Sequence, residues 1–576
     1  MSTAQHLSDL LRQRAVAEPD RVGFSYLADG EHESQSLTYG QLDRAAHSMA
    51  EKLLAIAKPG DRALLISAPG LEFLVGFFGC AYAGLVGVPV PAPHSTRPER
   101  SRGRLLAIAT DAQPTCIIAS IAEVQRLTTP GTRSALEQWP CVVADIDAST
   151  DSVQKTAPAA VDANDLAFLQ YTSGSTAEPR GVMVTHRNLM HNLECIRCFG
   201  ETDSTSVAVS WLPLHHDMGL IEGVLHPLYS GFPVWLMSPA AFLQKPLRWL
   251  RAISRYRATN SGAPDFAYAL CARRVTDAER ARLDLSSWSL AYNGSEPVRP
   301  STLAEFSERF ESCGFRSRSF SPVYGLAEST LAVTSNRRAD EPSVTMLSEE
   351  AGAVATVGCG QTTGGTDLRI VDPHSCVEVS QGSPGEIWIR SESIARGYWN
   401  RPDLTAKTFG GQLSDGQGPF LRTGDFGLER DDGQLVVTGR LKDLLIVRGQ
   451  KHHPTDLELT AESSHALLLP GNCAACAVGP NGDIVTILAE VDAKIVRDER
   501  VVEQLFAAIR REIALDHGVQ IQRIALFLPR SLPRTTSGKL QRHLCPSLVT
   551  DTGHPALASW PDSRKQKQRH GEVAST

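Results

Sequence analysis

Hydroxyl-bearing residues and glycines gather in one short segment, LQYTSGSTAEPRGVMV, at residues 169–184. Backbone N–H groups, hydroxyls and a guanidinium can together bind a polyphosphate, and an apolar run at 166–169 predicts a buried strand leading into the segment. No Gly-Lys-Ser/Thr follows at the spacing of a Walker loop. We therefore predict a phosphate-binding loop of another kind, although an ordinary serine- and glycine-rich surface loop fits the same residues. The candidate ligands are Thr172, Ser173, Gly174, Ser175, Thr176, Arg180 and Gly181.

Four further segments combine carboxylates, basic side chains and glycines in ways that suit a nucleotide. A carboxylate can accept hydrogen bonds from both ribose hydroxyls or hold Mg²⁺, and an aromatic ring can lie against a base. Taken singly, each segment also fits an ordinary turn or a solvated charged residue. The segments are YGLAE at 324–328, RTGD at 422–425, GRLKD at 439–443 and PRTTSGK at 533–539.

In this order, the five motifs resemble those of the adenylate-forming superfamily, whose members join carboxylates to AMP. Other segments are similar to fatty acyl-AMP ligases, the branch that activates fatty acids and passes them to carrier proteins. The resemblance implies ATP and Mg²⁺ as cofactors, a medium- or long-chain fatty acid as substrate, and release of pyrophosphate. These segments are WLPLHHDMGLI at 211–221, residues 242–271, YNGSEPV at 292–298 and RGQKHHPTDLE at 448–458.

The resemblance also assigns roles to single residues. Lys539 matches the catalytic lysine, and its ammonium can bridge the substrate carboxylate and the α-phosphate. His216 matches a histidine near the acyl carboxylate, although a structural histidine fits as well. Glu328 and Thr172 are the candidate Mg²⁺ ligands. The expected nucleotide site also contains Asn293, Gly294, Ser295, Tyr324, Gly325, Asp425 and Arg440.

The segment SGAPDFAY at 261–268 is expected to form a wall of an acyl tunnel. Small residues leave space there, and aromatic side chains supply apolar surface. Asp217 belongs to the version of the LPLHHDMG motif that resembles fatty acyl-AMP ligases, and its role is open. The predicted tunnel residues are Gly262, Ala263, Phe266 and Asp217.

Short apolar runs alternate with helical patterns up to about residue 440, which predicts an α/β protein with layered, largely parallel sheets. A small β-barrel-like part is expected at about 364–424, followed by a small α+β portion. The resemblance places a hinge at Lys442, although a solvated loop lysine fits the same position. The expected units are an N-terminal adenylate-forming domain at 1–441, a mobile C-terminal domain with the catalytic lysine at 442–550, and a flexible tail at 551–576.

Composition narrows the class of protein. With 576 residues, 42% of them hydrophobic and 21% charged, the chain predicts several globular units. A net charge of −7 argues against a general nucleic-acid binder. The apolar stretch at 73–90 contains glycines and a proline, so we expect a buried helix and strand rather than a membrane span. We expect a cytoplasmic protein, because the first residues lack a signal-peptide core.

Two CxxC pairs, Cys195/Cys198 and Cys473/Cys476, lie hundreds of residues apart. A zinc site would need both pairs to meet, or nearby histidines. We expect reduced cysteines that pack in the core.

The acyl acceptor has two candidates. Fatty acyl-AMP ligases resemble one another in an insertion that hampers the use of coenzyme A. The corresponding stretch at 336–360 looks shorter than that insertion and longer than a typical acyl-CoA ligase loop. A fatty acyl-CoA ligase is therefore the alternative to transfer onto an acyl carrier protein. Nothing after Lys539 resembles a carrier attachment site, so the carrier is expected in a separate chain of a polyketide, nonribosomal peptide or lipid pathway.

Two other classes of protein remain as hypotheses. A catalytically silent sensor of ATP or acyl-AMP is disfavoured by the presence of Lys539, Glu328 and Asp425. An amino-acid adenylating enzyme would need an acidic partner for the substrate ammonium, for which Asp265 is the candidate. The same carboxylate would suit a polar or hydroxylated acid.

Overall fold

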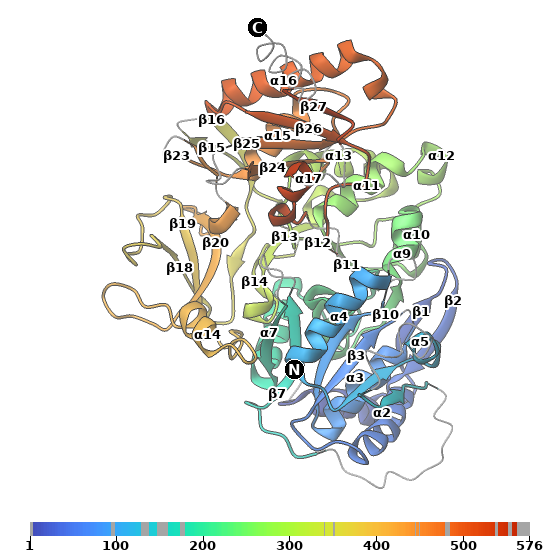
Figure 1. Ribbon diagram of the computed structural model, residues 1–576. Coiled ribbons are helices and arrows are strands. Elements are labelled where there is room, and N and C mark those ends of the chain that lie inside the picture. Colours follow the sequence, from blue (N-terminus) through green and yellow to red (C-terminus); the bar gives the residue numbers. More distant parts are fainter. Residues whose placement is uncertain are drawn as a thin grey trace.

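The structure is a computed structural model that contains two large sheets, a smaller antiparallel sheet and a C-terminal α+β part (Figure 1). The described residues are 4–68, 70–93, 98–127, 138–146, 159–172, 179–338, 340–349, 352–443, 445–447, 450–469, 471–478, 484–535, 540–550 and 556–561.

The larger sheet has nine strands in the order β17-β14-β13-β12-β11-β9-β10-β1-β2. Its central strands pair in parallel, and β2, β14 and β17 pair antiparallel at the edges. Parallel strands are joined by helical crossovers, as the alternating pattern predicted. The strands are β1 (Val22–Leu27), β2 (Glu33–Thr38), β9 (Ala208–Ser210), β10 (Val234–Met237), β11 (Asn260–Ala263), β12 (Leu290–Asn293), β13 (Phe320–Gly325), β14 (Ala332–Ser335) and β17 (Gln361–Thr362).

A second sheet has six strands in the order β6-β5-β3-β4-β7-β8, parallel except for β8. The apolar stretch at 73–90 forms a buried helix and a strand inside this sheet, which confirms the expectation from its glycines and proline. Gly84 ends the helix in the left-handed conformation at φ 68°. The strands are β3 (Arg62–Ser67), β4 (Val86–Pro91), β5 (Cys116–Ala119), β6 (Cys141–Val143), β7 (Leu166–Thr172) and β8 (Arg180–Thr185).

Helices of the large part pack their apolar faces on these sheets. Thr38 and Thr185 begin α2 and α7 with reciprocal capping boxes, in which side chain and backbone satisfy each other's hydrogen bonds. The helices are α1 (Leu7–Ala17), α2 (Tyr39–Leu54), α3 (Glu72–Ala83), α4 (Pro98–Ala112), α5 (Ile121–Leu127), α7 (His186–Gly200), the π-helix η1 (Met218–Leu225), α8 (His226–Ser230), α9 (Pro239–Gln244), α10 (Leu247–Tyr256), α11 (Asp265–Arg274), α12 (Asp277–Arg280), α13 (Pro300–Phe310), and the short turns η2 (Glu311–Cys313), η3 (Ser317–Ser319) and η4 (Ala327–Ser329).

The segment expected to be barrel-like is an antiparallel sheet in the order β18-β19-β20-β21, and it extends beyond 424 to Arg440. Between β18 and β19, Val371 and Glu378 form an isolated bridge. The elements are β18 (Asp367–Val371), β19 (Gly385–Arg390), α14 (Pro402–Phe409), β20 (Leu421–Glu429), β21 (Leu435–Arg440) and η5 (Leu441–Asp443), and a hairpin of β15 (Val344–Glu349) and β16 (Gly352–Val357) precedes them.

The C-terminal part is an α+β unit with its own apolar core, as predicted. It lies at the top of Figure 1, in orange and red. Its sheet has the order β24-β25-β26-β27, and α15 packs on both α16 and β24. The elements are β22 (Leu445–Val447), β23 (Gln450–His452), α15 (Pro454–Ser463), β24 (Cys473–Val478), β25 (Ile484–Glu490), η6 (Ile495–Arg497), α16 (Glu499–His517), β26 (Arg523–Phe527), η7 (Arg542–Leu544), α17 (Ser547–Thr550) and β27 (Ala558–Trp560).

Three of the four CxxC cysteines are buried, and Cys198 is exposed on α7. Within the described ranges, no cluster of three or more His, Cys, Asp or Glu side chains could hold a metal ion. Among the helices that the structure describes, none has both the length and the apolar character needed to cross a bilayer.

Candidate active site

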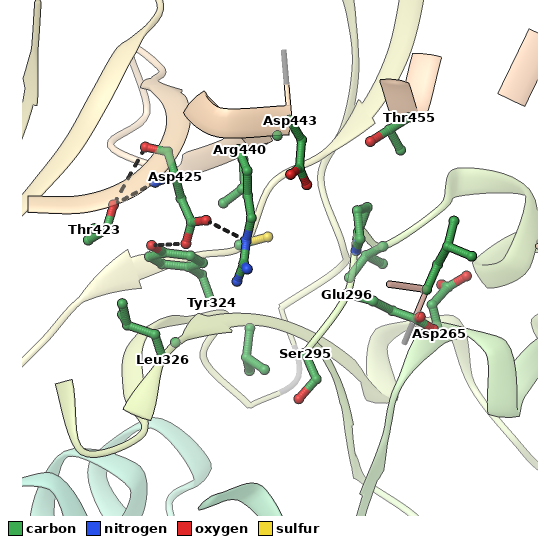
Figure 2. Close-up of a pocket in the computed structure, with 18 of the residues that line it drawn as sticks. Asp265, Ser295, Glu296, Tyr324, Leu326, Thr423, Asp425, Arg440, Asp443 and Thr455 are labelled. Atoms are coloured by element: carbon green, nitrogen blue, oxygen red, sulfur yellow. Dashed lines mark hydrogen bonds and ion pairs between the residues drawn. The ribbon is translucent and has the colours of Figure 1, made fainter. Parts of the chain in front are cut away.

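A cavity of about 940 Å³ is bounded by both the large part and the C-terminal part of the chain. Its walls include the ends of β7, β12 and β13, the π-helix η1, the RTGD and GRLKD segments, and C-terminal residues such as Thr455 and Gln541. Figure 2 shows side chains from several of these elements converging on it. The motifs predicted from the sequence therefore meet around a single cavity.

The parallel strands β12 and β13 direct their carboxyl ends toward this cavity, the usual ligand-binding edge of an open α/β sheet. Ser295 follows β12 and Tyr324 lies at the end of β13, and both line the cavity. Glycine is required beside them, because a Cβ at Gly294 would lie 2.9 Å from the carbonyl oxygen of Val323. A Cβ at Gly325 would overlap the carbonyl of Leu331.

Asp425 lies at the centre of a hydrogen-bonded group (Figure 2). The Tyr324 hydroxyl donates to its Oδ2 at 2.8 Å, and Arg440 Nε lies 3.1 Å from its Oδ1. Asp425 and Arg440 are direct partners across β20 and β21, so strand register joins residues fifteen apart in sequence. Burial and the nearby Asp425 charge raise the pKa of Tyr324, while Asp425 also raises that of Arg440. Arg440 keeps 54% of its side chain exposed, which leaves guanidinium surface for a ligand.

Glu386 holds the RTGD turn in place. Its carboxylate accepts hydrogen bonds from the Gly424 backbone N–H at 3.2 Å, from Arg422 at 2.9 Å and from the Trp388 indole at 2.9 Å. Gly424 has a φ of 70°, a left-handed conformation that glycine adopts without strain. The turn therefore presents Asp425 in a fixed orientation.

Glu328 accepts a hydrogen bond at Oε1 from the hydroxyl of Tyr398, at 2.6 Å. The Arg180 guanidinium lies over the Tyr398 ring, 5.8 Å from its centroid. Burial and the Glu328 charge raise the pKa of Tyr398, so its hydroxyl is protonated and donates. Tyr398 was not predicted from the sequence, because its partner lies seventy residues away and the RGYWN segment carries no spacing signal.

Thr172 and Arg180 face each other across β7 and β8, at the two ends of the predicted phosphate loop. Both line the cavity. Gly181 packs under the Tyr171 ring, where a Cβ would lie 2.9 Å from Cζ. Ser173, Gly174, Ser175 and Thr176 lie outside the described residues.

His216 and Asp217 line the cavity, whereas the adjacent half-buried His215 is absent from its lining, and its backbone carbonyl accepts a hydrogen bond from Gln170 at 2.8 Å. Burial lowers the pKa of His215 to about 3, which keeps that imidazole neutral. Asp217 begins the π-helix η1 by accepting a hydrogen bond from the Met218 N–H at 2.8 Å. Gly219 is needed in this motif because a Cβ there would overlap the Pro213 carbonyl.

The predicted tunnel residues separate into two groups. Phe266 and Asp217 line the cavity, whereas Gly262 and Ala263 are buried in β11 and are absent from its lining. A Cβ on Gly262 would lie 2.8 Å from the Cβ of Tyr292 and 3.0 Å from the Met218 methyl group. Gly262 therefore serves close packing of β11 rather than open space.

Asp265 is 3% exposed, and the chain itself supplies its hydrogen-bond donors. Asn293 Nδ2 lies 3.0 Å from Oδ1, the Arg299 N–H 3.2 Å from the same oxygen, and the Thr302 hydroxyl 2.8 Å from Oδ2. Burial raises the pKa of Asp265. With these donors in place, Asp265 anchors the start of α13, and it does not present the free acidic group that an amino-acid adenylating site requires.

Lys539 lies outside the described residues, and only the backbone of Lys442 is described, in the turn η5 directly after β21. Thr535 and Leu540, on either side of the undescribed stretch, both line the cavity. The carboxylate of Glu328 suits Mg²⁺, which prefers oxygen ligands, and its bond to Tyr398 uses one of its two oxygens.

These observations bring the candidate nucleotide-binding residues together where two parts of the chain meet, and comparison with known sequences gives the class of protein. A sequence model described as "AMP-binding enzyme" matches residues 11–399, and one described as "Disco-interacting protein 2-like, AMP domain" matches residues 442–549. The chain belongs to the AMP-binding enzyme family and, within it, to the fatty acyl-AMP ligases of the adenylate-forming superfamily.

Two curated relatives and one solved structure illustrate the similarity. The medium-chain-fatty-acid–[acyl-carrier-protein] ligase JamA of Moorena producens is 40% identical over 94% of this chain and 94% of its own. The long-chain-fatty-acid–AMP ligase FadD23 of Mycobacterium tuberculosis is 35% identical over 96% and 98%. The crystal structure of a Legionella pneumophila fatty acyl-adenylate ligase with acyl adenylate and pyrophosphate superposes with a TM-score of 0.74, at 36% identity over 97% and 98%.

Proposed function

We propose that this protein activates a medium- or long-chain fatty acid as acyl-AMP, with release of pyrophosphate, and transfers the acyl group to an acyl carrier protein. The observation that carries the proposal is the single cavity in which a polar nucleotide-type end adjoins an apolar wall. Tyr324, Asp425 and Arg440 form the polar end, and the apolar lining includes Ile196, Phe199, Met218, Leu331 and Ala332. The names of the relatives JamA, a medium-chain-fatty-acid–[acyl-carrier-protein] ligase, and FadD23, a long-chain-fatty-acid–AMP ligase, support this proposal.

Each polar residue has a proposed role in binding ATP. The Tyr324 ring would lie against adenine, and Asp425 would accept hydrogen bonds from the ribose hydroxyls. Arg440 would contact the same nucleotide. Thr172, Arg180 and the undescribed residues between them would bind the phosphates. Asn293, Gly294, Ser295 and Gly325 complete the proposed nucleotide site.

The reacting groups would meet beside these residues. Glu328, with Thr172, would hold Mg²⁺, which when bound neutralises charge on the phosphate oxygens. His216 would orient the acyl carboxylate, and Lys539 would stabilise the negative charge that develops between carboxylate and α-phosphate. Lys442 is the proposed hinge between domains at 1–441 and 442–550.

The acceptor is the second half of the proposal. The stretch at 336–360 contains the β15–β16 hairpin, and Ala355, Thr356 and Val357 of that hairpin line the cavity. A hairpin against the cavity would restrict the approach of a coenzyme A nucleotide, while a phosphopantetheine arm is thin enough to enter. The carrier would belong to a polyketide, nonribosomal peptide or lipid pathway.

Product analysis tests this proposal. The purified protein is incubated with ATP, Mg²⁺ and a panel of fatty acids, with coenzyme A in one half and a phosphopantetheinylated carrier protein in the other. Acyl-AMP that persists with coenzyme A and transfers to the carrier, identified by mass, is the expected result. Rapid acyl-CoA formation would instead establish the coenzyme A ligase.

A further inference from the structure

A glutamic acid lies inside the apolar part of the cavity. Glu222 is 7% exposed, belongs to the π-helix η1 and lines the cavity. Its helix packs against α7, from which Ile196 and Phe199 line the same cavity. In sequence it interrupts an otherwise apolar run, MGLIEGVL. Its position is therefore a polar point in a wall that otherwise suits an alkyl chain.

The Glu222 carboxyl has no hydrogen-bond or ion-pair partner among the residues that the structure describes. Asp265 differs in this respect, since its nearby donors come from Asn293, Thr302 and a backbone N–H. Because Glu222 lines the cavity, an apolar chain that filled the cavity would remove the carboxyl from water and give it no hydrogen bond in return. Such a group is uncommon in a folded protein, and a bound ligand is one way to satisfy it.

Burial raises the pKa of Glu222 to about 8. At neutral pH the group is therefore mostly the uncharged acid, which offers one O–H donor and a carbonyl acceptor. Such a group complements a hydroxyl or oxo oxygen and requires no counter-ion.

A second polar atom is unsatisfied in the same region. The hydroxyl of Tyr292 is buried without a hydrogen-bond partner in the described part of the chain, and Tyr292 also lines the cavity. Burial and then the charge of Glu222 raise the pKa of Tyr292, which places the two groups in one electrostatic environment. The Tyr292 hydroxyl is buried below the cavity surface, so Glu222 is the polar group that an acyl chain would meet in this wall.

We propose that the acyl tunnel selects a fatty acid bearing a neutral oxygen substituent, a hydroxyl or an oxo group, and that Glu222 is the residue that recognises it. The inference rests on the proposed function, because it names the substrate class of the same cavity. An unsubstituted chain would cover the carboxyl without replacing its bonds to water, whereas a substituent at the matching carbon would donate to it or accept from it. Sites that hydrogen-bond a substrate hydroxyl discriminate strongly against the analogue that lacks it.

A positional series of acids tests the inference. Dodecanoic acid and its analogues with one hydroxyl, oxo or amino group at successive carbons are compared by ATP–pyrophosphate exchange, with kcat/KM measured for each. The variants are Glu222→Gln, which keeps shape and hydrogen bonding, and Glu222→Leu, which removes the polar group. Glu308→Leu, an exposed change on α13, is the matched control. The melting temperature of each protein reports whether it is folded.

In the wild type and Glu308→Leu, we expect one oxygenated isomer to exceed dodecanoic acid by about tenfold or more in kcat/KM. Glu222→Leu should lose most of that ratio while retaining or gaining activity on dodecanoic acid, and Glu222→Gln should retain part of it. If the wild type prefers dodecanoic acid, and the ratio of kcat/KM values is the same in Glu222→Leu, the inference is overturned but the proposed function still stands. Preference for an amino-substituted acid would contradict the claim that the recognised substituent is neutral. If no acid supports exchange, the proposed function is overturned as well.

Discussion

The Tyr398 hydroxyl donates a 2.6 Å hydrogen bond to Glu328 Oε1, and the same tyrosine ring lies beneath the guanidinium of Arg180. One aromatic residue thus joins the proposed metal ligand to the proposed phosphate loop. A hydrogen bond to a ligating carboxylate orients that carboxylate and tunes its affinity for the metal.

Removing this hydroxyl should weaken Mg²⁺ binding during adenylation. In Tyr398→Phe the ring remains under Arg180 while Glu328 loses its donor, so we expect the Mg²⁺ concentration for half-maximal exchange to rise about tenfold. The measurement is ATP–pyrophosphate exchange across a Mg²⁺ titration. Tyr256→Phe, which alters a tyrosine stacked on Trp235 and absent from the cavity lining, is the control. Equal Mg²⁺ curves for both variants would contradict the role of Tyr398.

Asp425→Asn should impair ATP binding. The change removes the charge that pairs with Arg440 and weakens the acceptor for Tyr324, so the KM for ATP should rise about tenfold to a hundredfold. The control is Asp432→Asn in the turn of the same β20–β21 hairpin, which should leave the KM within about threefold. An unchanged KM for ATP in Asp425→Asn would rule out the ribose contact.

Lys539→Ala should distinguish the formation of acyl-AMP from the binding of ATP. We expect acyl-AMP formation to fall by a factor of about 100 to 1,000, because a developing negative charge loses its ammonium, while ATP affinity changes by less than about threefold. Single-turnover acyl-AMP formation and equilibrium ATP binding provide the two readouts. Lys494→Ala, an exposed lysine of the same C-terminal part, should behave as wild type. Wild-type acyl-AMP formation by Lys539→Ala would refute the assigned role.

A buried ion pair connects the large part to the C-terminal part: Arg299 Nη1 lies 3.0 Å from Glu462 Oε2, and the Glu462 side chain is 4% exposed. Arg299→Ala would leave this acid without its cation, so we expect a loss of about 3 kcal/mol in the free energy of unfolding. Adding Glu462→Gln should restore part of it, since a neutral amide needs no counter-ion.

Chemical denaturation measures these differences. The control is Arg257→Ala, which breaks an exposed pair with Asp284 and should lower stability by less than about 1 kcal/mol. Equal losses in Arg299→Ala and Arg257→Ala would show that the buried contact does not stabilise the observed arrangement.

Glu222 predicts a pH dependence of stability. Folding raises its pKa from 4.5 to about 8, so its contribution to stability is full below about pH 4.5 and is lost as pH rises toward 8. The loss amounts to about 5 kcal/mol at most, from 1.36 kcal/mol per unit. Glu222→Gln, which does not titrate, should therefore become more stable relative to wild type between pH 5 and pH 8. A constant difference across denaturation curves at pH 5, 6.5 and 8 would contradict the raised pKa.

The sequence determined the fold class and named the residues of the proposed nucleotide site. Alternating apolar runs and helical patterns predicted parallel sheets because side-chain periodicity is a local property, and glycines predicted the helix and strand within 73–90 for the same reason. The motifs that contain Tyr324, Asp425 and Arg440 were found because each is a short continuous segment.

The tertiary structure decided which residues meet. Tyr398 and Glu328, seventy residues apart, become partners through the packing of separate elements, which no local pattern encodes. Gly262 was predicted to leave tunnel space, but β11 brings it against Tyr292 and Met218. The tertiary structure also distinguishes two buried acids. Asp265 receives hydrogen bonds from donors of the chain, whereas Glu222 lies in the cavity wall without a donor among the described residues. Whether a buried carboxyl is satisfied depends on contacts between distant segments, and these exist only after folding.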